Sequence, residues 1–246
     1  DLEAYYKTGY GAVLSTTIDK YVYVTVNEKF AKKIRASYSE TEYVDNVEQI
    51  KHHLIRESLI ETGIRNSIDI VYMADMLPGR EGSGLGGSSS ILVGLLNSLY
   101  NFNNENKSPE FLADKACKIE IEKLGHPIGK QDQYAASFGG FNFIRFNANG
   151  SVDVQPLKIN PETIANLSSR LLLFHVGFNM RSDKILTEQK EKTNNNLETI
   201  GEMVKMAEDL KISLESGNLD NFGYILNEGW QKKRTLSSNI TNSTID

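Results

Sequence analysis

The sequence has few of the residues that cross-link or stiffen a chain. Its 246 residues include one cysteine, five prolines and one tryptophan, and no apolar run is long enough to cross a membrane. The single cysteine, Cys117, cannot form an internal disulfide, and its neighbours Ala113 and Ala116 predict a small buried side chain on a helix. No signal peptide is evident. We therefore expect a cytoplasmic protein without disulfides.

A strong charge of either sign is also lacking. The net charge is −5, and the 27 lysines and arginines are spread along the chain. This pattern predicts neither nucleic-acid nor membrane-surface binding, so any phosphate binding must depend on local features. With 39% hydrophobic residues, the chain can bury the core of one large domain or of two smaller ones.

The most informative segment is the loop PGREGSGLGGSSS at residues 78–90. The strand-like run Ile68 to Met73 precedes it and the apolar run Ile91 to Tyr100 follows, which predicts the order strand, loop, helix. Glycines let successive N–H groups point into one concavity, and a helix start adds free N–H donors and a positive dipole end. The hydroxyls of residues 88–90 can cap the helix, contact phosphate or ligate Mg²⁺. The segment therefore predicts a phosphate-binding loop.

Three types of glycine loop can be compared with this segment. Gly82, Gly84 and Gly87 formally satisfy the dinucleotide fingerprint G-x-G-x-x-G. The acid that this fingerprint needs about 20 residues on would be Glu105, which falls in an Asn-rich helix end rather than after a second strand. A Walker A loop is excluded because no lysine follows the last glycine, and a near match from Gly125 is one residue too short. The third type, P-x-x-x-G-L-G-S-S, matches best.

This third type resembles the nucleotide-binding motif of the GHMP kinases, the superfamily of galactokinase, homoserine kinase, mevalonate kinase and phosphomevalonate kinase. Residues 124–142, LGHPIGKQDQYAASFGGFN, resemble the segment that carries the superfamily's catalytic aspartate. The particular residues of this segment are similar to those of the sugar-1-kinase branch. Residues 1–6, DLEAYY, and 11–19, GAVLSTTID, are similar to that branch just after its first glycine-rich motif. The resemblance covers most of the chain.

The resemblance implies an α+β protein with the two-lobed GHMP kinase fold. A ribosomal-S5-domain-2-like nucleotide-binding lobe is expected over residues 1–160 and an α/β lobe over residues 161–246. In this branch a glycine-rich run precedes the residue matched by Asp1, and a third glycine-rich motif follows the helix that ends the present sequence. We therefore expect the sequence to be the middle of a larger enzyme, incomplete at both ends.

The resemblance further implies an ATP- and Mg²⁺-dependent kinase, in which phosphoryl transfer needs a phosphate cradle, a cation, a proton acceptor and stabilising charge. Magnesium is expected on Ser88, with neighbouring Ser89 as a second candidate, and on Glu120, with Glu122 as the fallback; a solvated acid beside lysines explains either glutamate equally well. The nucleotide is expected on a set of loop residues: Gly82, Gly84, Leu85, Gly86, Gly87, Ser88, Ser89 and Ser90.

Asp132 is the expected base. Lys130 is expected beside it as a second catalytic residue that pairs with Asp132 or with a phosphate, although a surface lysine is the default interpretation of this residue. The residues alone favour a different role for Asp132, that of a cap for a helix over residues 133–137. The resemblance favours the base, because an aspartate needs little pKa tuning to accept a hydroxyl proton late in a loose transition state.

The acceptor is expected to contact Asp1, which matches an aspartate that holds sugar hydroxyls, and Arg181, whose bidentate guanidinium suits a sugar phosphate. Lys233 and Arg234 are secondary candidates. The reaction implied is phosphorylation of the anomeric hydroxyl of D-glycero-D-manno-heptose 7-phosphate to the 1,7-bisphosphate. A fucose- or galactose-type kinase, a catalytically silent nucleotide or sugar binder on this fold, and a dinucleotide-dependent oxidoreductase remain alternatives.

The residue pattern also predicts secondary structure outside the loop. A helix over Val47 to Thr62 should end at Gly63, with His52 and His53 on its polar surface. The other expected elements are paired strands over Ala12 to Thr17 and Tyr21 to Asn27, a helix over Ser108 to Leu124, a hairpin of Phe141 to Phe146 with Val152 to Leu157, and a strand over Arg170 to Val176 followed by long helices.

Overall fold

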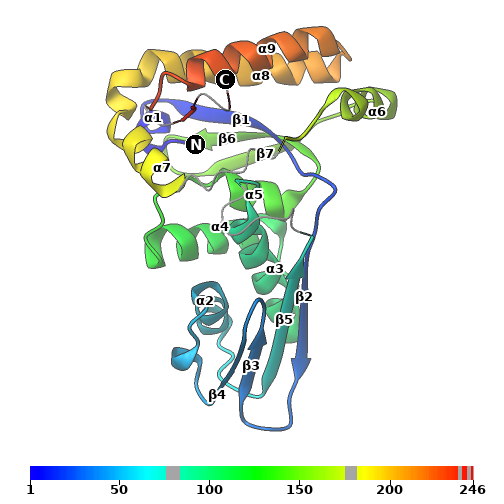
Figure 1. The fold of residues 1–246 in the computed structure, drawn as a ribbon, viewed down its shortest axis with the longest axis vertical. Helices are drawn as coiled ribbons and strands as arrows, with labels where there is room; N and C mark the ends of the chain where they lie inside the picture. The colour runs from blue at the N-terminus through cyan, green and yellow to red at the C-terminus, as the bar shows by residue number, and fades with distance from the viewer. Residues whose placement is uncertain (76–83, 175–181, 238–239, 243–244, 246) are drawn as a thin grey trace. The chain divides into compact units, whose positions relative to one another are not determined.

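The computed structural model of the protein describes residues 1–75, 84–174, 182–237, 240–242 and 245. The chain divides into two compact units (Figure 1). Unit 1 comprises Asp1–Thr17 and Gly139–Asp246, and unit 2 comprises Ile18–Phe138. Both units contain helices and strands, which confirms the α+β class expected from the sequence.

Unit 1 is built on an antiparallel sheet of order β1-β6-β7. Helix α8 packs on β1 and α9 packs on α8, and apolar side chains of α6, α8 and α9 form a small core. The predicted hairpin is confirmed as β6 and β7. The elements are α1 (Glu3–Tyr6), β1 (Tyr10–Thr16), β6 (Phe141–Asn147), β7 (Val152–Pro156), α6 (Pro161–Arg170), α7 (Ser182–Glu191), the 3-10 helix η3 (Thr193–Asn196), α8 (Leu197–Glu215) and α9 (Leu219–Lys233).

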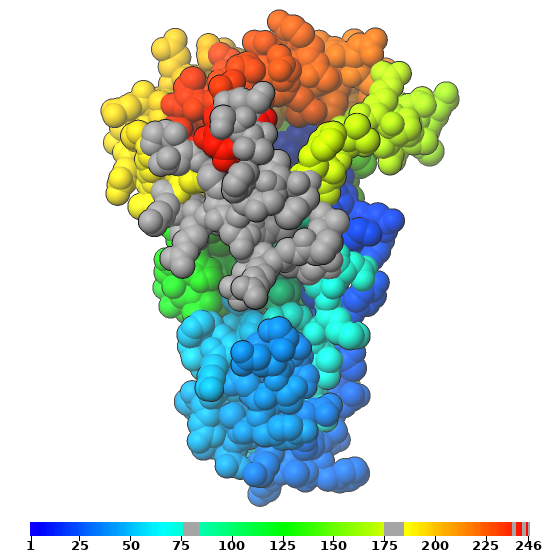
Figure 2. All heavy atoms as spheres, in the orientation of Figure 1, coloured from blue at the N-terminus to red at the C-terminus, as the bar shows by residue number. Residues whose placement is uncertain are grey.

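Unit 2 carries a sheet of order β2-β5-β3-β4, in which β3 pairs with β5 in parallel and the other pairings are antiparallel. In the space-filling view its residues from about 30 to 60, in blue and light blue, form one continuous surface (Figure 2). The elements are β2 (Val22–Glu28), β3 (Ile34–Ser37), β4 (Thr41–Val44), the 3-10 helix η1 (Val47–Gln49), α2 (His53–Thr62), β5 (Ile68–Ala74), α3 (Gly87–Phe102), α4 (Pro109–Cys117), the π-helical η2 (Lys118–Lys123) and α5 (Gln131–Phe138).

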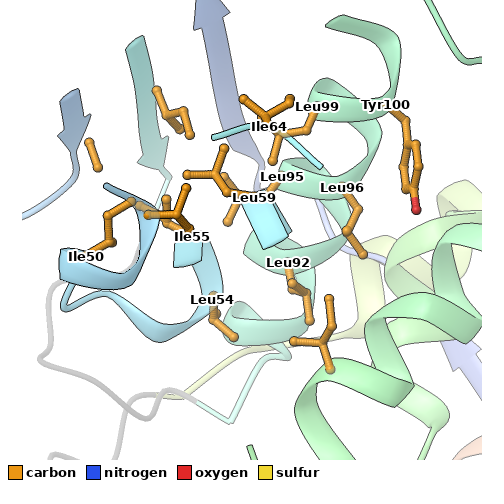
Figure 3. Packing of buried hydrophobic residues seen from close by; sticks show 14 of the residues in the cluster. Ile50, Leu54, Ile55, Leu59, Ile64, Leu92, Leu95, Leu96, Leu99 and Tyr100 are labelled. Carbon is orange, nitrogen blue, oxygen red and sulfur yellow. The ribbon is translucent and has the colours of Figure 1, made fainter. Parts of the chain in front are cut away.

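The core of unit 2 lies between α2, α3 and the sheet (Figure 3). Ile55 and Leu59 of α2 are fully buried and pack with α3 in this core. The apolar helix predicted after the glycine loop is confirmed as α3. A Cβ added to Gly94 would lie 3.1 Å from Cγ2 of Val24, so α3 runs very close to β2. This packing fixes α3 on its sheet. The helix contributes a row of fully buried leucines at helical spacing, namely Leu92, Leu95, Leu96 and Leu99.

The single helix expected over residues 47–62 is wrong, because two short helices replace it. The buried carboxylate of Glu42 accepts the backbone N–H of Lys51 at 2.8 Å and that of His52 at 3.2 Å. These N–H groups then cannot bond to carbonyls of a preceding helical turn, so η1 ends before α2 begins. The predicted end of the helix is confirmed: Gly63 takes φ +72° as the C-cap of α2.

His52 is not the surface residue that the sequence predicts, whereas His53 is exposed. His52 is the N-cap of α2, and its Nδ1 accepts the N–H of Ile55 at 3.4 Å. Its Nε2 lies 2.9 Å from the hydroxyl of Tyr72. Because Nδ1 accepts, the neutral ring carries its proton on Nε2 and donates it to Tyr72. Burial lowers the pKa of His52.

The strands expected at residues 12–17 and 21–27 exist but do not pair with each other, which corrects the sequence prediction. β1 pairs with β6 in unit 1, and β2 pairs with β5 in unit 2. The N–H of Thr17 donates to the carbonyl of Gly140 at 3.1 Å, which extends the β1–β6 ladder past the strand end. The short connection between the two strands therefore leads from one sheet to another rather than forming a hairpin.

The strand expected over Arg170 to Val176 is also wrong in its described part. Arg170 is the last residue of α6, and residues 171–174 form no regular secondary structure. Their apolar run is typical of a strand, but a strand needs a neighbour to bond with, and no described strand pairs with them. Residues 175 and 176 lie outside the described residues.

Within the described residues, no helix combines the length and apolar character that a membrane crossing requires.

Candidate active site

The described part of the glycine loop leads directly into α3. Gly84 and Gly86 take φ +70°, a left-handed conformation that favours glycine. Gly86 is the N-cap of α3 and has no side chain with which to cap it. Helix geometry leaves the first backbone N–H groups without partners inside the helix, so those at Gly87 and Ser88 can serve an anion. Gly82 lies outside the described residues.

Asp132 lies beside this loop. It belongs to the first turn of α5, a helix that packs against α3 and α4, and its side chain is exposed. A Cβ placed on Gly86 would lie 3.6 Å from Cγ and 3.7 Å from Oδ2 of Asp132. The helix begins at Gln131, one residue before Asp132, so Asp132 is within the first turn and is not the N-cap. The structure thus brings together the two motifs that the sequence predicts for phosphate binding and for the base.

Glu120 completes this group from a third segment. Its side chain is fully buried, at 0% exposure. Its Oε2 accepts two hydrogen bonds, from the hydroxyl of Ser89 at 2.7 Å and from Nε2 of Gln133 at 2.6 Å. Its other oxygen, Oε1, has no hydrogen-bond partner among the described residues. One buried carboxylate therefore links the start of α3 to the first turn of α5 and retains a free acceptor.

The π-helical turn η2 explains how Glu120 comes to point inward. Within it the N–H of Leu124 donates to the carbonyl of Ile119, five residues earlier, at 2.9 Å. The wider turn buries both Ile119 and Glu120, two consecutive residues, at 0% exposure. Insertions of this kind are often found at functional sites. The expected helix over residues 108–124 is confirmed as α4, capped by Ser108, with η2 as its last turns.

The donor set around Glu120 fits a magnesium ion. A buried carboxylate is costly unless a cation balances it, and no lysine or arginine among the described residues is ion-paired with Glu120. Mg²⁺ commonly takes one or two carboxylates and fills its remaining positions with water and phosphate oxygens. The described residues accordingly hold no group of three or more His, Cys, Asp or Glu side chains able to bind a metal alone.

Among the alternative metal ligands, the structure brings together Ser89 and Glu120. Ser89 is 1% exposed and donates its hydroxyl proton to Glu120, so its oxygen lone pairs remain for a cation. Ser88 and Glu122 are both exposed, and Ser88 lies in the first turn of α3 beside Ser89. Ser88 and Ser89 thus both remain candidates, and Glu120 is better placed than Glu122.

Lys130 is half-buried in the segment that leads into α5. Its positive charge acts on the thiol of Cys117. Burial raises the pKa of that thiol to about 12, and the charge of Lys130 opposes this shift. Cys117 is therefore a buried, protonated thiol, as its helical neighbours predict.

The residues expected to bind the acceptor are not among this group. Asp1, Lys233 and Arg234 belong to unit 1, whereas Gly86, Glu120 and Asp132 belong to unit 2. Arg181 lies outside the described residues. The roles of these four residues remain predictions from the sequence.

Gln133 belongs to the same cluster of side chains as Glu120, and the sequence did not predict this. The sequence predicts it only as the start of a helix, whereas its side chain is fully buried and donates a hydrogen bond to Glu120. The sequence offers only a weak signal for it, a polar residue next to the aromatic Tyr134, and both side chains are buried in the structure.

The oxidoreductase alternative has no support in the described residues. Glu105, the acid that a dinucleotide fingerprint needs at the end of a second strand, lies in the loop after α3 and is ion-paired with Lys107 at 2.7 Å. α3 is followed by another helix, α4, so the strand–helix–strand unit of a dinucleotide fold is absent there.

Comparison with known proteins identifies one domain of the chain. Residues 43–140, which include the glycine loop, Glu120 and Asp132, match the sequence model of the GHMP kinases N terminal domain. This part of the chain is a GHMP kinase N-terminal domain. The resemblance that the three sequence motifs predict is thereby confirmed.

Alignments with individual relatives extend beyond residues 43–140 and cover most or all of the chain. A D-glycero-alpha-D-manno-heptose 7-phosphate kinase of Campylobacter jejuni is 27% identical over 259 aligned positions, covering 100% of this chain and 76% of the relative. A crystal structure of a D-glycero-D-manno-heptose 1-phosphate kinase from Bacteroides thetaiotaomicron is 28% identical with a TM-score of 0.78, covering 92% of this chain and 71% of that one. The two names place the substrate's phosphate on different carbons.

The GHMP kinase fold is shared more widely. The galactokinase of Lactococcus lactis, solved with galactose, is only 17% identical but has a TM-score of 0.67, and the match covers 98% of this chain and 73% of the galactokinase. At this identity the likeness concerns the fold alone. It confirms the expected fold class.

Proposed function

We propose that this chain is the catalytic part of an ATP-dependent sugar kinase that converts D-glycero-D-manno-heptose 7-phosphate to the 1,7-bisphosphate. The observation that carries the proposal is the meeting of three segments in unit 2: the start of α3, the buried Glu120, and Asp132 on α5. Each supplies one requirement of phosphoryl transfer. The names of the relatives support a heptose phosphate as the acceptor.

The phosphates of ATP bind at the start of α3. The left-handed glycines leave the backbone bare, and the first N–H groups of the helix donate to phosphate oxygens, helped by the positive end of the helix dipole. The hydroxyls of residues 88–90 add further donors. A ligand there would lie beside Asp132, because Gly86 and Asp132 are neighbours.

Magnesium, when bound, would supply positive charge that balances the negative charge of the phosphates. Oε1 of Glu120 would hold it as the carboxylate ligand, and the oxygen of Ser89 or Ser88 would be the hydroxyl ligand. The free lone pairs of Oε1, fully buried and without a donor among the described residues, support this assignment.

Asp132 acts on the acceptor. A bond forms between the anomeric oxygen of the sugar and the γ-phosphorus, while the bond from that phosphorus to the β–γ bridging oxygen breaks and ADP leaves. The hydroxyl proton passes to the carboxylate of Asp132 late in this transfer. Lys130 contributes positive charge beside the same turn.

Recognition of the sugar's existing phosphate is assigned to Arg181, with Lys233 and Arg234 as alternatives. A guanidinium matches a phosphate with two parallel hydrogen bonds, whereas a neutral hexose offers no such partner. A fucose- or galactose-type acceptor is the competing possibility within the same reaction. ATP as the phosphoryl donor agrees with the cytoplasmic location expected from the sequence.

An acceptor panel tests the proposal. Production of ADP is followed with ATP, Mg²⁺ and one of heptose 7-phosphate, heptose 1-phosphate, galactose, fucose or mevalonate. We expect heptose 7-phosphate to give the highest kcat/KM, about tenfold or more above the neutral sugars of the panel, because charged hydrogen bonds to a phosphate are each worth about 1.5–3 kcal/mol. A preference for a neutral hexose would contradict the heptose phosphate, and no turnover with any acceptor would contradict the kinase.

A further inference from the structure

Gln133 is a buried polar residue in the first turn of α5, next to the exposed Asp132. It is 0% exposed, and its Nε2 donates to Oε2 of Glu120 at 2.6 Å. The orientation of the amide follows from this contact, since the opposite orientation would set an amide oxygen against a carboxylate oxygen. Its own Oε1 has no hydrogen-bond partner among the described residues. A glutamine that only filled space would be a poor choice, because burying its unpaired carbonyl is costly.

The contact fixes the orientation of the Glu120 carboxylate. Both of its hydrogen bonds, from Ser89 and from Gln133, go to the same oxygen, Oε2. Two donors on one oxygen oppose rotation of the carboxylate and leave Oε1 directed to whatever lies on its other side. With Ser89 alone, the carboxylate could turn and present either oxygen to a cation.

We propose that Gln133 is a positioning residue that orients Glu120 for magnesium and ties this metal ligand to the turn of α5 that carries Asp132. Adjacent residues of one turn, Asp132 and Gln133, point to different places: the first is exposed beside Gly86, and the second is buried against Glu120. The inference rests on the proposed function, because it assigns a cation to Glu120. Hydrogen-bond partners of metal ligands commonly change metal affinity or activity by about 10–100-fold when they are removed.

The test measures metal binding without the sugar. Binding of Mn²⁺ to the ADP complex of the full chain is followed by electron paramagnetic resonance, and binding of ADP alone is measured in EDTA. Gln133→Met keeps the volume but removes the donor, and we expect it to weaken Mn²⁺ binding about tenfold or more while metal-free ADP binding stays within about twofold. Ser58→Ala is the control, since it removes another buried hydrogen-bonding side chain of unit 2, on α2, and should leave Mn²⁺ affinity unchanged.

Unchanged Mn²⁺ affinity in Gln133→Met would overturn the inference and leave the proposed kinase intact. If the unmodified chain bound neither ADP nor Mn²⁺ with ADP, both the inference and the proposed function would be wrong. A measurement on the unmodified chain decides the matter if the variant does not fold. The side-chain amide signal of Gln133 in a ¹⁵N spectrum should shift when Mg²⁺ is added to the ADP complex, and an unshifted signal would overturn the inference.

Discussion

A buried carboxylate costs free energy unless a positive group or several donors balance it. Glu120 is balanced on one oxygen only, by Ser89 and Gln133, and this half-satisfied state is the clearest sign of a ligand in unit 2. The sequence predicted Glu120 only through its resemblance to a family, because an acid between lysines on a helix is equally typical of a solvated face. Its burial depends on the π-helical turn, which no residue pattern announces.

Replacing Asp132 by asparagine tests its role as the base. Asp132→Asn keeps the shape of the side chain and removes its charge, so turnover should fall about 10²–10⁴-fold while ATP affinity is nearly kept. Asp114→Asn is the matched control, because it removes the charge of another exposed acid of unit 2, paired with Lys118 at 2.7 Å, and should leave turnover unchanged. Steady-state kinetics and nucleotide binding provide both readouts. An Asp132→Asn variant that retained most of its kcat would show that Asp132 is structural.

A methyl group on Gly86 tests the phosphate cradle. Gly86→Ala puts a Cβ within 3.6–3.7 Å of the Asp132 carboxylate and strains a residue at φ +70°. Gly63→Ala is a close control, since its φ is +72° and nothing lies within 4 Å of the added Cβ. Both variants should lose about 1–2 kcal/mol of stability, but only Gly86→Ala should raise the dissociation constant of ATP by more than tenfold. Equal ATP affinity in the two variants, measured by calorimetry, would remove Gly86 from the site.

At the scale of helices and strands, the elements with strong local signals were predictable. The capped start of α4 at Ser108 and Pro109, the glycine end of α2 and the hairpin of β6 and β7 all depend on neighbours in sequence. The pairing of β1 and β2 with distant strands does not depend on neighbours in sequence, because a strand of alternating apolar residues fits any partner strand of matching register. The break between η1 and α2 also depends on a tertiary contact. The carboxylate of Glu42, on β4, accepts the backbone N–H groups of Lys51 and His52.

The N-cap of α2 should make stability depend on pH. Burial lowers the pKa of His52 from its usual 6.5 in the folded state, so the unfolded chain binds the proton more readily. The contribution of neutral His52 to the stability of the folded chain is therefore fully present above pH 6.5. It is lost as the pH falls through the lower pKa that His52 has in the folded state. Tm should fall when the pH is lowered from about 7.5 to 5.5. His52→Asn should reduce this fall, because asparagine can also cap a helix but does not take up a proton in this range.

His53→Asn controls for the loss of a histidine as such. His53 is exposed on the same helix, and its replacement should leave the pH dependence of Tm as it is in the unmodified chain. If the two variants changed the pH dependence equally, the titration of His52 would not be its source.

At the scale of the whole molecule, the chain is divided in a way that sequence order conceals. The first strand, β1, belongs with the residues after 138, and everything from Ile18 to Phe138 forms the other unit. Contacts between residues far apart in sequence decide this division. The lobes expected at residues 1–160 and 161–246 remain a prediction. The resemblance of three motifs implied the fold class, and the glycines and serines of residues 78–90 predicted the phosphate-binding loop. The link through Gln133 required the packed structure.

The most direct test of the central claim is the ³¹P spectrum of a reaction containing the chain, ATP, Mg²⁺ and D-glycero-D-manno-heptose 7-phosphate. The γ-phosphorus signal of ATP should disappear as ADP forms, and a second sugar phosphate signal, split by the anomeric proton, should grow at the same rate. Growth of inorganic phosphate alone, or an ATP spectrum unchanged over many hours, would contradict phosphoryl transfer to the anomeric hydroxyl.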